Sequence, residues 1–281
     1  MPTVRRIRPV RFLPSLATLA NLACGVGALM YLMDAARTGN LHLLTRAGWL
    51  LVLATVFDAL DGKLARLTRG TSSIGAQLDS LADLVTFGVV PAMLARSLVI
   101  LDGPAHEIRM HPRLLVVAPI LYALCAALRL ARFNVQHANE EGDADHGDFV
   151  GLPSPAAAAL PIAMVLFYFG LNDPSFLLHP GPEAQFTLRE VILRALPFVL
   201  VLNGALMVTR IRYPHFMAWL SRQRRPFPWL AEILVIGGLL LIEPELALLL
   251  ASLVFLVVPA LTALYRAVFR RGASAEHLET R

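Results

Sequence analysis

Four aspartates stand at regular spacing in one short segment, residues 57–88, which separates long apolar runs. Asp58 and Asp61 are three residues apart, and Asp79 and Asp83 are four apart. On an α-helix, either spacing places the two carboxylates of a pair on one face. Clustered carboxylate oxygens are the ligands that hard divalent cations prefer, so the pattern predicts metal-assisted chemistry.

The four carboxylates need compensation if they lie in a membrane. An aspartate at the bilayer centre costs about 2.5 to 3.5 kcal/mol on insertion scales, so four facing lipid would cost roughly 10 to 14 kcal/mol. That is comparable to the whole stability of a domain, about 5 to 15 kcal/mol. Lys63 and Arg66 supply only two positive charges nearby, too few for a structural network of ion pairs. Four carboxylates suit two cations about 3.5 to 4 Å apart.

Small residues accompany the aspartates on the same predicted stripes. Gly62 and Ala65, with Arg66, continue the stripe of the first pair, and Gly75 lies one turn before the second pair. Since eight residues separate Arg66 from Gly75, the two helices must be antiparallel neighbours whose stripes can face each other across a cleft. The small side chains leave room there for something flat, whereas plain helix packing is the alternative reading of each one.

The composition is that of a helical membrane protein. Of the 281 residues, 57% are hydrophobic and 16% are charged, and the mean hydropathy is +0.62. Several apolar runs approach the roughly 20 residues that a helix needs to cross a bilayer, and the alternating pattern of a β-barrel is absent. The fold class is therefore expected to be all-α, a polytopic transmembrane bundle. About eight spans are predicted, at residues 13–33, 44–66, 75–100, 114–133, 155–171, 190–209, 228–242 and 246–268.

No internal repeat or low-complexity linker divides the chain, so residues 1–281 are expected to form a single membrane domain. Cys24 and Cys125 fall within predicted spans and indicate neither a disulfide nor a metal-binding thiol cluster. The eight histidines include no pair spaced four apart, and none is predicted to be a ligand or a base.

The distribution of lysine and arginine predicts the orientation. Most of the 25 basic residues fall on one side of the eight-span arrangement. The positive-inside rule makes that side cytoplasmic, which places both termini and the aspartates there, in a protein of the cytoplasmic membrane. The sequence pI of about 9.8 is then a sign of topology, and no nucleic-acid partner is expected.

The full pattern resembles the signature of the CDP-alcohol phosphatidyltransferase family. The matching positions are Asp58, Asp61, Gly62, Ala65, Arg66, Gly75, Asp79 and Asp83. The resemblance implies a catalytic core of six spans in residues 1–210, with residues 211–281 as an additional two-span hairpin and tail. It also implies transfer of a phosphatidyl group from a CDP-linked lipid to an alcohol, with release of CMP.

The resemblance assigns a role to each position. Two divalent cations, Mg²⁺ or Mn²⁺, are expected on Asp58, Asp61, Asp79 and Asp83. Asp83 is also the expected catalytic general base. The site for CDP-diacylglycerol is expected to include Gly62, Ala65, Arg66, Ser72, Gly75 and Asn21. Because homodimers are common in this family, a homodimer surrounded by membrane lipids is expected.

Further segments resemble the branch of the family that uses serine as acceptor: residues 11–25, 128–135, 149–158 and 209–216. The expected reaction is then transfer from CDP-diacylglycerol to L-serine, giving phosphatidylserine. Arg129 and Arg132 are candidates for binding the serine carboxylate. They are equally typical of positive-inside anchors, and an arginine pair would also suit glycerol 3-phosphate or inositol phosphate as acceptor.

An ion-coupled transporter is the rival interpretation, because carboxylates within a membrane often mark ion paths. Here the acids are concentrated at one membrane face. The sequence shows neither an inverted repeat nor a pair of interrupted helices. The enzyme interpretation is therefore preferred.

Overall fold

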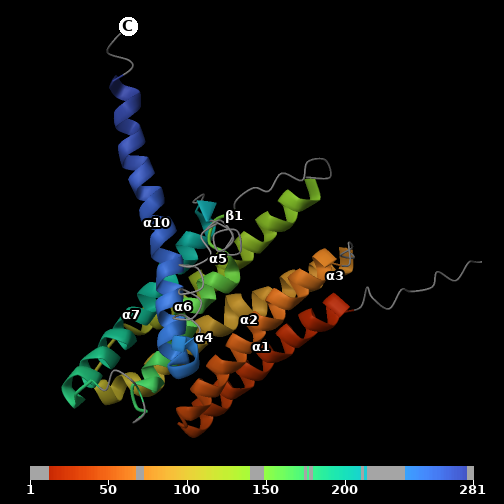
Figure 1. Ribbon diagram of the computed structural model, residues 1–281. Helices are drawn as coiled ribbons and strands as arrows, with labels where there is room; N and C mark the ends of the chain where they lie inside the picture. Colours follow the sequence, from red (N-terminus) through yellow and green to blue (C-terminus); the bar gives the residue numbers. More distant parts are fainter. Residues whose placement is uncertain are drawn as a thin grey trace, which may run out of the picture.

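The protein is an all-α membrane bundle, seen in a computed structural model that describes residues 13–67, 73–139, 149–173, 176, 180–209, 212–213 and 238–276. The α-helices are α1 (Leu13–Thr38), α2 (His42–Leu67), α3 (Ser73–Asp83), α4 (Val90–Asp102), α5 (Pro112–Asn139), α6 (Ser154–Gly170), α7 (Pro182–Val208) and α10 (Pro244–Glu276). Shorter elements are the π-helix η2 (Leu84–Val89), the 3-10 helix η3 (Gly103–His106) and the antiparallel two-residue strands β1 (Phe149–Val150) and β2 (Arg212–Tyr213). The predicted fold class is confirmed (Figure 1).

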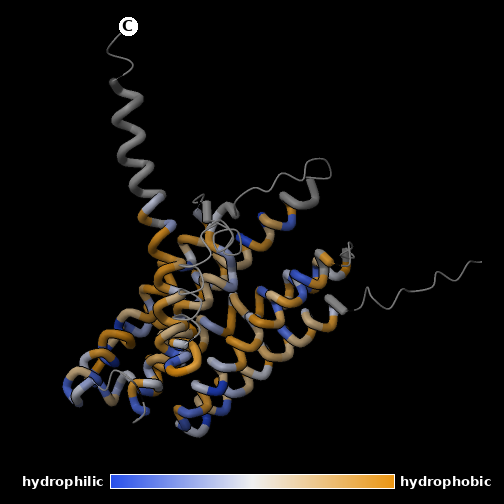
Figure 2. Tube along the Cα trace, viewed as in Figure 1, coloured by the Kyte–Doolittle hydropathy of each residue, from blue (hydrophilic) through white to orange (hydrophobic). Residues whose placement is uncertain are grey.

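Five segments of the described chain are long and apolar enough to cross a membrane: Ser15–Thr38, His42–Leu64, Ile74–His106, Pro112–Val135 and Pro182–Val208. Figure 2 shows hydrophobic residues along the length of the helices and hydrophilic residues gathered toward their ends. Helix α6 and the Pro244–Pro259 part of α10 are apolar but shorter. Of the predicted seventh span, only residues 238–242 are described, and they are helical.

Observed helices and predicted spans differ mainly at their ends. Helix α1 continues to Thr38, beyond the predicted end at residue 33. Helix α7 begins at Pro182, although the apolar pattern begins only near residue 190. Hydropathy marks the part of a helix inside the hydrocarbon, whereas the helix itself can continue into the polar boundary.

Small residues allow the first two helices to pack closely as an antiparallel pair. Ala28 and Ala35 on α1 and Ala47 and Ala54 on α2 are fully buried, and each pair is spaced by seven residues. Small side chains of this kind let membrane helices approach each other. Helix α6 lies at the centre of the bundle, where it contacts α2, α4, α7 and α10.

Two prolines inside the helices are compensated by side chains from neighbouring helices. Pro119 in α5 and Pro161 in α6 cannot donate a backbone bond to the carbonyl four residues earlier. Instead, Arg96 Nε donates to the Leu115 carbonyl at 3.1 Å, and Asn203 Nδ2 donates to the Ala157 carbonyl at 2.9 Å. Because backbone groups in a membrane must be satisfied within the protein, these bonds hold α4 against α5 and α7 against α6.

Candidate functional site

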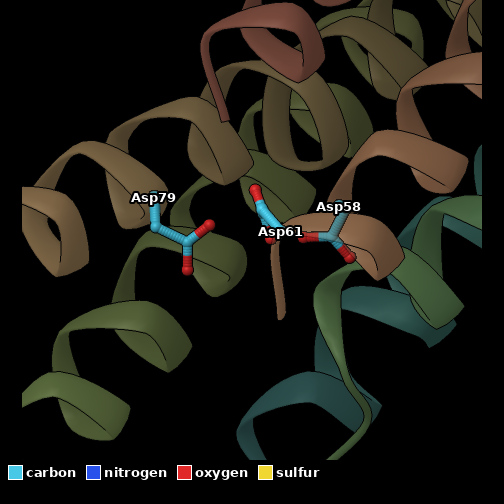
Figure 3. Close-up of side chains that lie close together, drawn as sticks. All are labelled: Asp58, Asp61 and Asp79. Atoms are coloured by element: carbon cyan, nitrogen blue, oxygen red, sulfur yellow. The ribbon is translucent and has the colours of Figure 1, made fainter. Parts of the chain in front are cut away.

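The acidic cluster lies between α2 and α3, near the end of the bundle where α2 ends and α3 begins; we call this the aspartate end (Figure 1). One carboxylate oxygen from each of Asp58, Asp61 and Asp79 lies within 4.8 Å of the other two. Figure 3 shows the three side chains approaching one another from the two helices. Asp61 is buried, while Asp58 and Asp79 are half-buried. The structure thus brings the two predicted stripes together.

Asp83, the last residue of α3, also belongs to the cluster. Its side chain is 9% exposed, and its carboxyl group is within hydrogen-bonding reach of Asp58. Asn21 Nδ2 donates to Asp83 Oδ1 at 3.4 Å. Two carboxyl groups at this separation repel each other unless a proton or a cation lies between them.

Helix α1 supplies two polar side chains to the cluster. Thr18 donates its hydroxyl to Asp61 Oδ2 at 2.9 Å, and Asn21 is fully buried beside Asp83. Thr18 is not among the residues predicted from the sequence. The signal was present, because two polar residues three apart in an apolar helix indicate an inward-facing stripe.

The donor set fits hard divalent cations. Asp79 Oδ1 is buried and has no hydrogen-bond partner among the described residues. A buried carboxylate oxygen is costly in a medium of low dielectric unless a proton or a cation compensates it. Since carboxylate oxygens are the ligands that Mg²⁺ and Mn²⁺ prefer, the cluster is suited to metal binding.

The residues predicted for the nucleotide lipid lie on the same two helices. Gly62 is one turn beyond the first aspartate, and a Cβ added there would meet nothing within 4 Å, so space is open beside the cluster. Gly75 is half-buried, one turn before the second pair. Outside the described part are the side chains of Ala65 and Arg66 and the whole of Ser72.

The π-helix η2 follows Asp83 directly and was not predicted from the sequence, which indicated one continuous span. Pro91 cannot donate the usual backbone bond to the Phe87 carbonyl, and the Tyr122 hydroxyl of α5 donates to that carbonyl at 3.0 Å. π-Helical turns are rare and occur frequently at functional sites. The bond from Tyr122 therefore supports the segment that positions the end of α3.

We expect Tyr122→Phe to destabilise the protein by about 1 to 3 kcal/mol, because it removes the donor to a buried carbonyl. Tyr122 is fully buried. Turnover should fall as well, since η2 is continuous with Asp83. Thermal unfolding in detergent and activity per folded protein measure the two effects, with Tyr31→Phe on α1 as the control. Unchanged unfolding and turnover would show that the bond does not support this segment.

The two predicted acceptor arginines lie in different surroundings. Arg129 is within electrostatic range of Asp83 and Asp58, and its guanidinium donates to the Ser154 hydroxyl at the start of α6. Arg132 Nη1 instead donates at 3.4 Å to the carbonyl of the last residue of α7. A positive charge is favourable at a helix C-terminus. Arg129 therefore faces the aspartates, and Arg132 contacts the end of a helix.

The described parts of three segments that resemble the serine-using branch meet at the aspartate end. Residues 128–135 contact residues 149–158 through Arg129 and Ser154. Strand β1 pairs with β2, which lies in residues 209–216. Between them, Gly151 has a φ of +91°, and a side chain there would collide with the Met207 carbonyl. This position therefore requires glycine.

In a comparison of sequences, residues 11–193 match the CDP-alcohol phosphatidyltransferase family, in agreement with the spacing of the aspartates. The chain belongs to this family. A Helicobacter pylori protein named CDP-diacylglycerol–serine O-phosphatidyltransferase is 33% identical over 210 residues, 75% of each chain. Proteins of the same name from Methanocaldococcus jannaschii and Saccharomyces cerevisiae are 34% identical over 179 residues (64% of this chain, 69% of that one) and 37% identical over 150 (52% and 51%). The predicted CDP-alcohol phosphatidyltransferase activity is confirmed.

Proposed function

We propose that the protein transfers the phosphatidyl group of CDP-diacylglycerol to the hydroxyl of L-serine, giving phosphatidylserine and CMP. The observation that carries the chemistry is the convergence of oxygens from Asp58, Asp61 and Asp79 within 4.8 Å of one another. Serine as acceptor is supported by the names of the similar proteins. It is also supported by Arg129, a cation near the aspartates, whose bond to Ser154 joins two of the segments that resemble the serine-using branch.

The proposed ligands of two divalent cations, Mg²⁺ or Mn²⁺, are Asp58, Asp61, Asp79 and Asp83. Such cations, when bound, neutralise the pyrophosphate and stabilise the charge that develops on the departing CMP. The protein itself contributes positioning. Hydrogen bonds from Thr18 and Asn21 orient Asp61 and Asp83, so that less reorganisation is needed during the reaction.

Asp83 is the proposed general base. It accepts the proton of the serine hydroxyl, whose oxygen forms a bond to the phosphorus that carries diacylglycerol. The bond from that phosphorus to the bridging oxygen breaks, and CMP leaves with the electron pair. Arg129, within electrostatic range of Asp83, can hold the serine carboxylate through two parallel hydrogen bonds.

The proposed site for CDP-diacylglycerol uses the open space beside Gly62. It further includes Asn21, Ala65, Arg66, Ser72 and Gly75. A guanidinium such as that of Arg66 suits a phosphate because its planar fork donates two hydrogen bonds. The lipid enters sideways from the bilayer and serine enters from the cytoplasm, which places the aspartate end and both termini at the cytoplasmic face of the cell membrane. A homodimer remains a prediction.

An acceptor scan tests the proposed function. Purified protein is incubated with CDP-diacylglycerol and Mg²⁺ or Mn²⁺, and CMP release is measured with serine, glycerol 3-phosphate or inositol phosphate. We expect serine to be preferred by at least about tenfold in kcat/KM, because a site that hydrogen-bonds one acceptor rejects those that leave its groups unpaired. Release of CMP only with glycerol 3-phosphate would overturn the serine assignment. CMP release that proceeds equally well when no acceptor is added would overturn the transferase proposal.

Arg129→Ala is expected to raise the KM for serine by roughly 10- to 150-fold, the equivalent of a lost charge-assisted hydrogen bond. The KM for CDP-diacylglycerol should change much less. Arg132→Ala is the matched comparison and should raise the serine KM less, because Arg132 contacts the end of α7. Steady-state kinetics with each substrate varied in turn give both values. Equal increases for serine and lipid in Arg129→Ala would indicate a structural role.

A further inference from the structure

A second cluster of polar side chains lies at the end of the bundle opposite the aspartate end. It consists of Asp102 at the end of α4, His106 in η3, Tyr168 near the end of α6 and Arg189 near the start of α7. The Tyr168 hydroxyl bonds to Asp102 and, at 3.0 Å, to His106 Nε2. The Arg189 guanidinium lies over the Tyr168 ring, 5.3 Å from its centre. The phosphatidyl transfer proposed above uses none of these groups.

Hydrogen-bond accounting shows which atoms of His106 and Tyr168 are satisfied. The Tyr168 hydroxyl has a single proton, and an ionised Asp102 carboxylate can only accept, so the hydroxyl donates to Asp102 and accepts from His106 Nε2. His106 is 9% exposed, and its Nδ1 is buried without a hydrogen-bond partner among the described residues. In the His106 ring, Nε2 is therefore the nitrogen that is satisfied, and Nδ1 is the one without a partner in this part of the chain.

Arg189 has two donors without a partner. Its Nε and Nη2 are both buried and make no hydrogen bond within the described part of the chain. These two atoms form one edge of the guanidinium, whose parallel N–H groups match two oxygens of a phosphate or carboxylate. Leaving buried charged donors unpaired costs more than the roughly 1 to 3 kcal/mol of a neutral group, so an oxyanion at this edge would be strongly favoured.

The surroundings of this edge indicate which oxyanion fits. Phe186, Leu188 and Val191, which flank Arg189 on α7, are 50%, 39% and 57% exposed. The Phe186 ring also packs on His106, with ring centres 4.8 Å apart. The start of α7 precedes the apolar run that begins near residue 190, so this part of the helix lies in the membrane boundary, at the level of the lipid phosphates and the first acyl carbons.

We propose that Arg189 binds the phosphate of an anionic phospholipid in the leaflet opposite the aspartate cluster. The Nε and Nη2 edge of Arg189 binds two phosphate oxygens, and Phe186 contacts the first acyl carbons. Because the site joins η3 and α7, with Tyr168 of α6 beneath it, the bound lipid stabilises the packing of the bundle. A free phosphate ion offers the same oxygens, so the experiment must distinguish the two sources.

Thermal unfolding of the full-length protein in detergent tests the site. Phosphatidylglycerol, phosphatidylcholine and inorganic phosphate are added in separate titrations. We expect a rise in Tm with phosphatidylglycerol alone, since binding to the native state stabilises it. Arg189→Gln should weaken the apparent affinity at least about tenfold. The control Arg194→Gln, on the same helix, should keep it, because Arg194 is exposed and paired with Glu190.

Each outcome decides the proposal. Stabilisation by inorganic phosphate alone would overturn the lipid assignment and leave a site for a free ion. Stabilisation by phosphatidylglycerol that is unchanged in Arg189→Gln, or the lack of any stabilisation by an anionic lipid, would overturn the site. If Arg189→Gln does not fold, Arg189→Lys replaces it, with the same expected direction, because lysine keeps the charge but lacks the edge with two parallel donors. Serine-dependent CMP release should persist in these variants, which separates failure of this site from failure of the proposed reaction.

Discussion

Asp83→Asn reduces kcat for phosphatidyl transfer by about 10²- to 10⁴-fold, in our expectation, because an amide cannot accept the proton of the attacking hydroxyl. The substitution is nearly isosteric, so the side chain should still fill the buried position beside Asn21 of α1. CMP release from purified variant protein at saturating substrates measures the effect. Substantial activity in Asp83→Asn would remove the role of Asp83 as base.

Stability separates a catalytic loss from a folding defect in Asp83→Asn. Carboxylates of the cluster repel one another when no cation is bound, so removing one charge should leave the Tm unchanged or raise it in metal-free buffer. Asp34→Asn, an exposed acidic residue of α1, is the matched control and should retain both turnover and stability. A large fall in the Tm of Asp83→Asn alone would indicate a mainly structural carboxylate.

Removal of divalent cations should abolish CMP release. In excess EDTA, nothing would compensate the joint negative charge of the aspartates and the pyrophosphate. Mg²⁺ or Mn²⁺ added in excess of the chelator should restore turnover, whereas K⁺ at equal ionic strength should not. Full activity in EDTA would contradict a metal-dependent mechanism.

Titration with Mg²⁺ should also stabilise the protein against unfolding, because a ligand that binds only the native state raises the protein's free energy of unfolding. The gain is about 2.7 kcal/mol at a free concentration 100 times the Kd. Mg²⁺ should therefore raise the Tm of the wild-type protein, and the rise should shrink in Asp61→Asn, which alters the buried carboxylate that Thr18 orients. An equal rise in both proteins would place the binding of the ion elsewhere.

The helices and the acidic stripes were predictable because they depend on local periodicity. The spacing of Asp58, Asp61 and Asp79 determines helix faces, and a short connection forces two helices to be neighbours, so their meeting follows without knowledge of the rest of the fold. The length and apolar character of the spans indicate membrane helices for the same reason.

Features that depend on contacts between distant helices were not predictable from the chain. The π-helical turn after Asp83 and its bond from Tyr122 require knowledge of how α5 packs on η2. The different surroundings of Arg129 and Arg132 depend on where α6 begins and α7 ends. In the opposite cluster, the spacing of His106 four residues after Asp102 was visible in the sequence, but Tyr168 is 62 residues away.

Binding of Mn²⁺, followed by electron paramagnetic resonance, tests most directly whether the aspartates form a metal centre. The purified protein is titrated with Mn²⁺ and compared with the double variant Asp61→Asn/Asp79→Asn. We predict saturation at about two ions per chain for the wild type, with the magnetic coupling of ions about 3.5 to 4 Å apart, and loss of both features in the variant. Wild-type protein that binds no Mn²⁺, or a double variant that binds it as the wild type does, would contradict the metal centre.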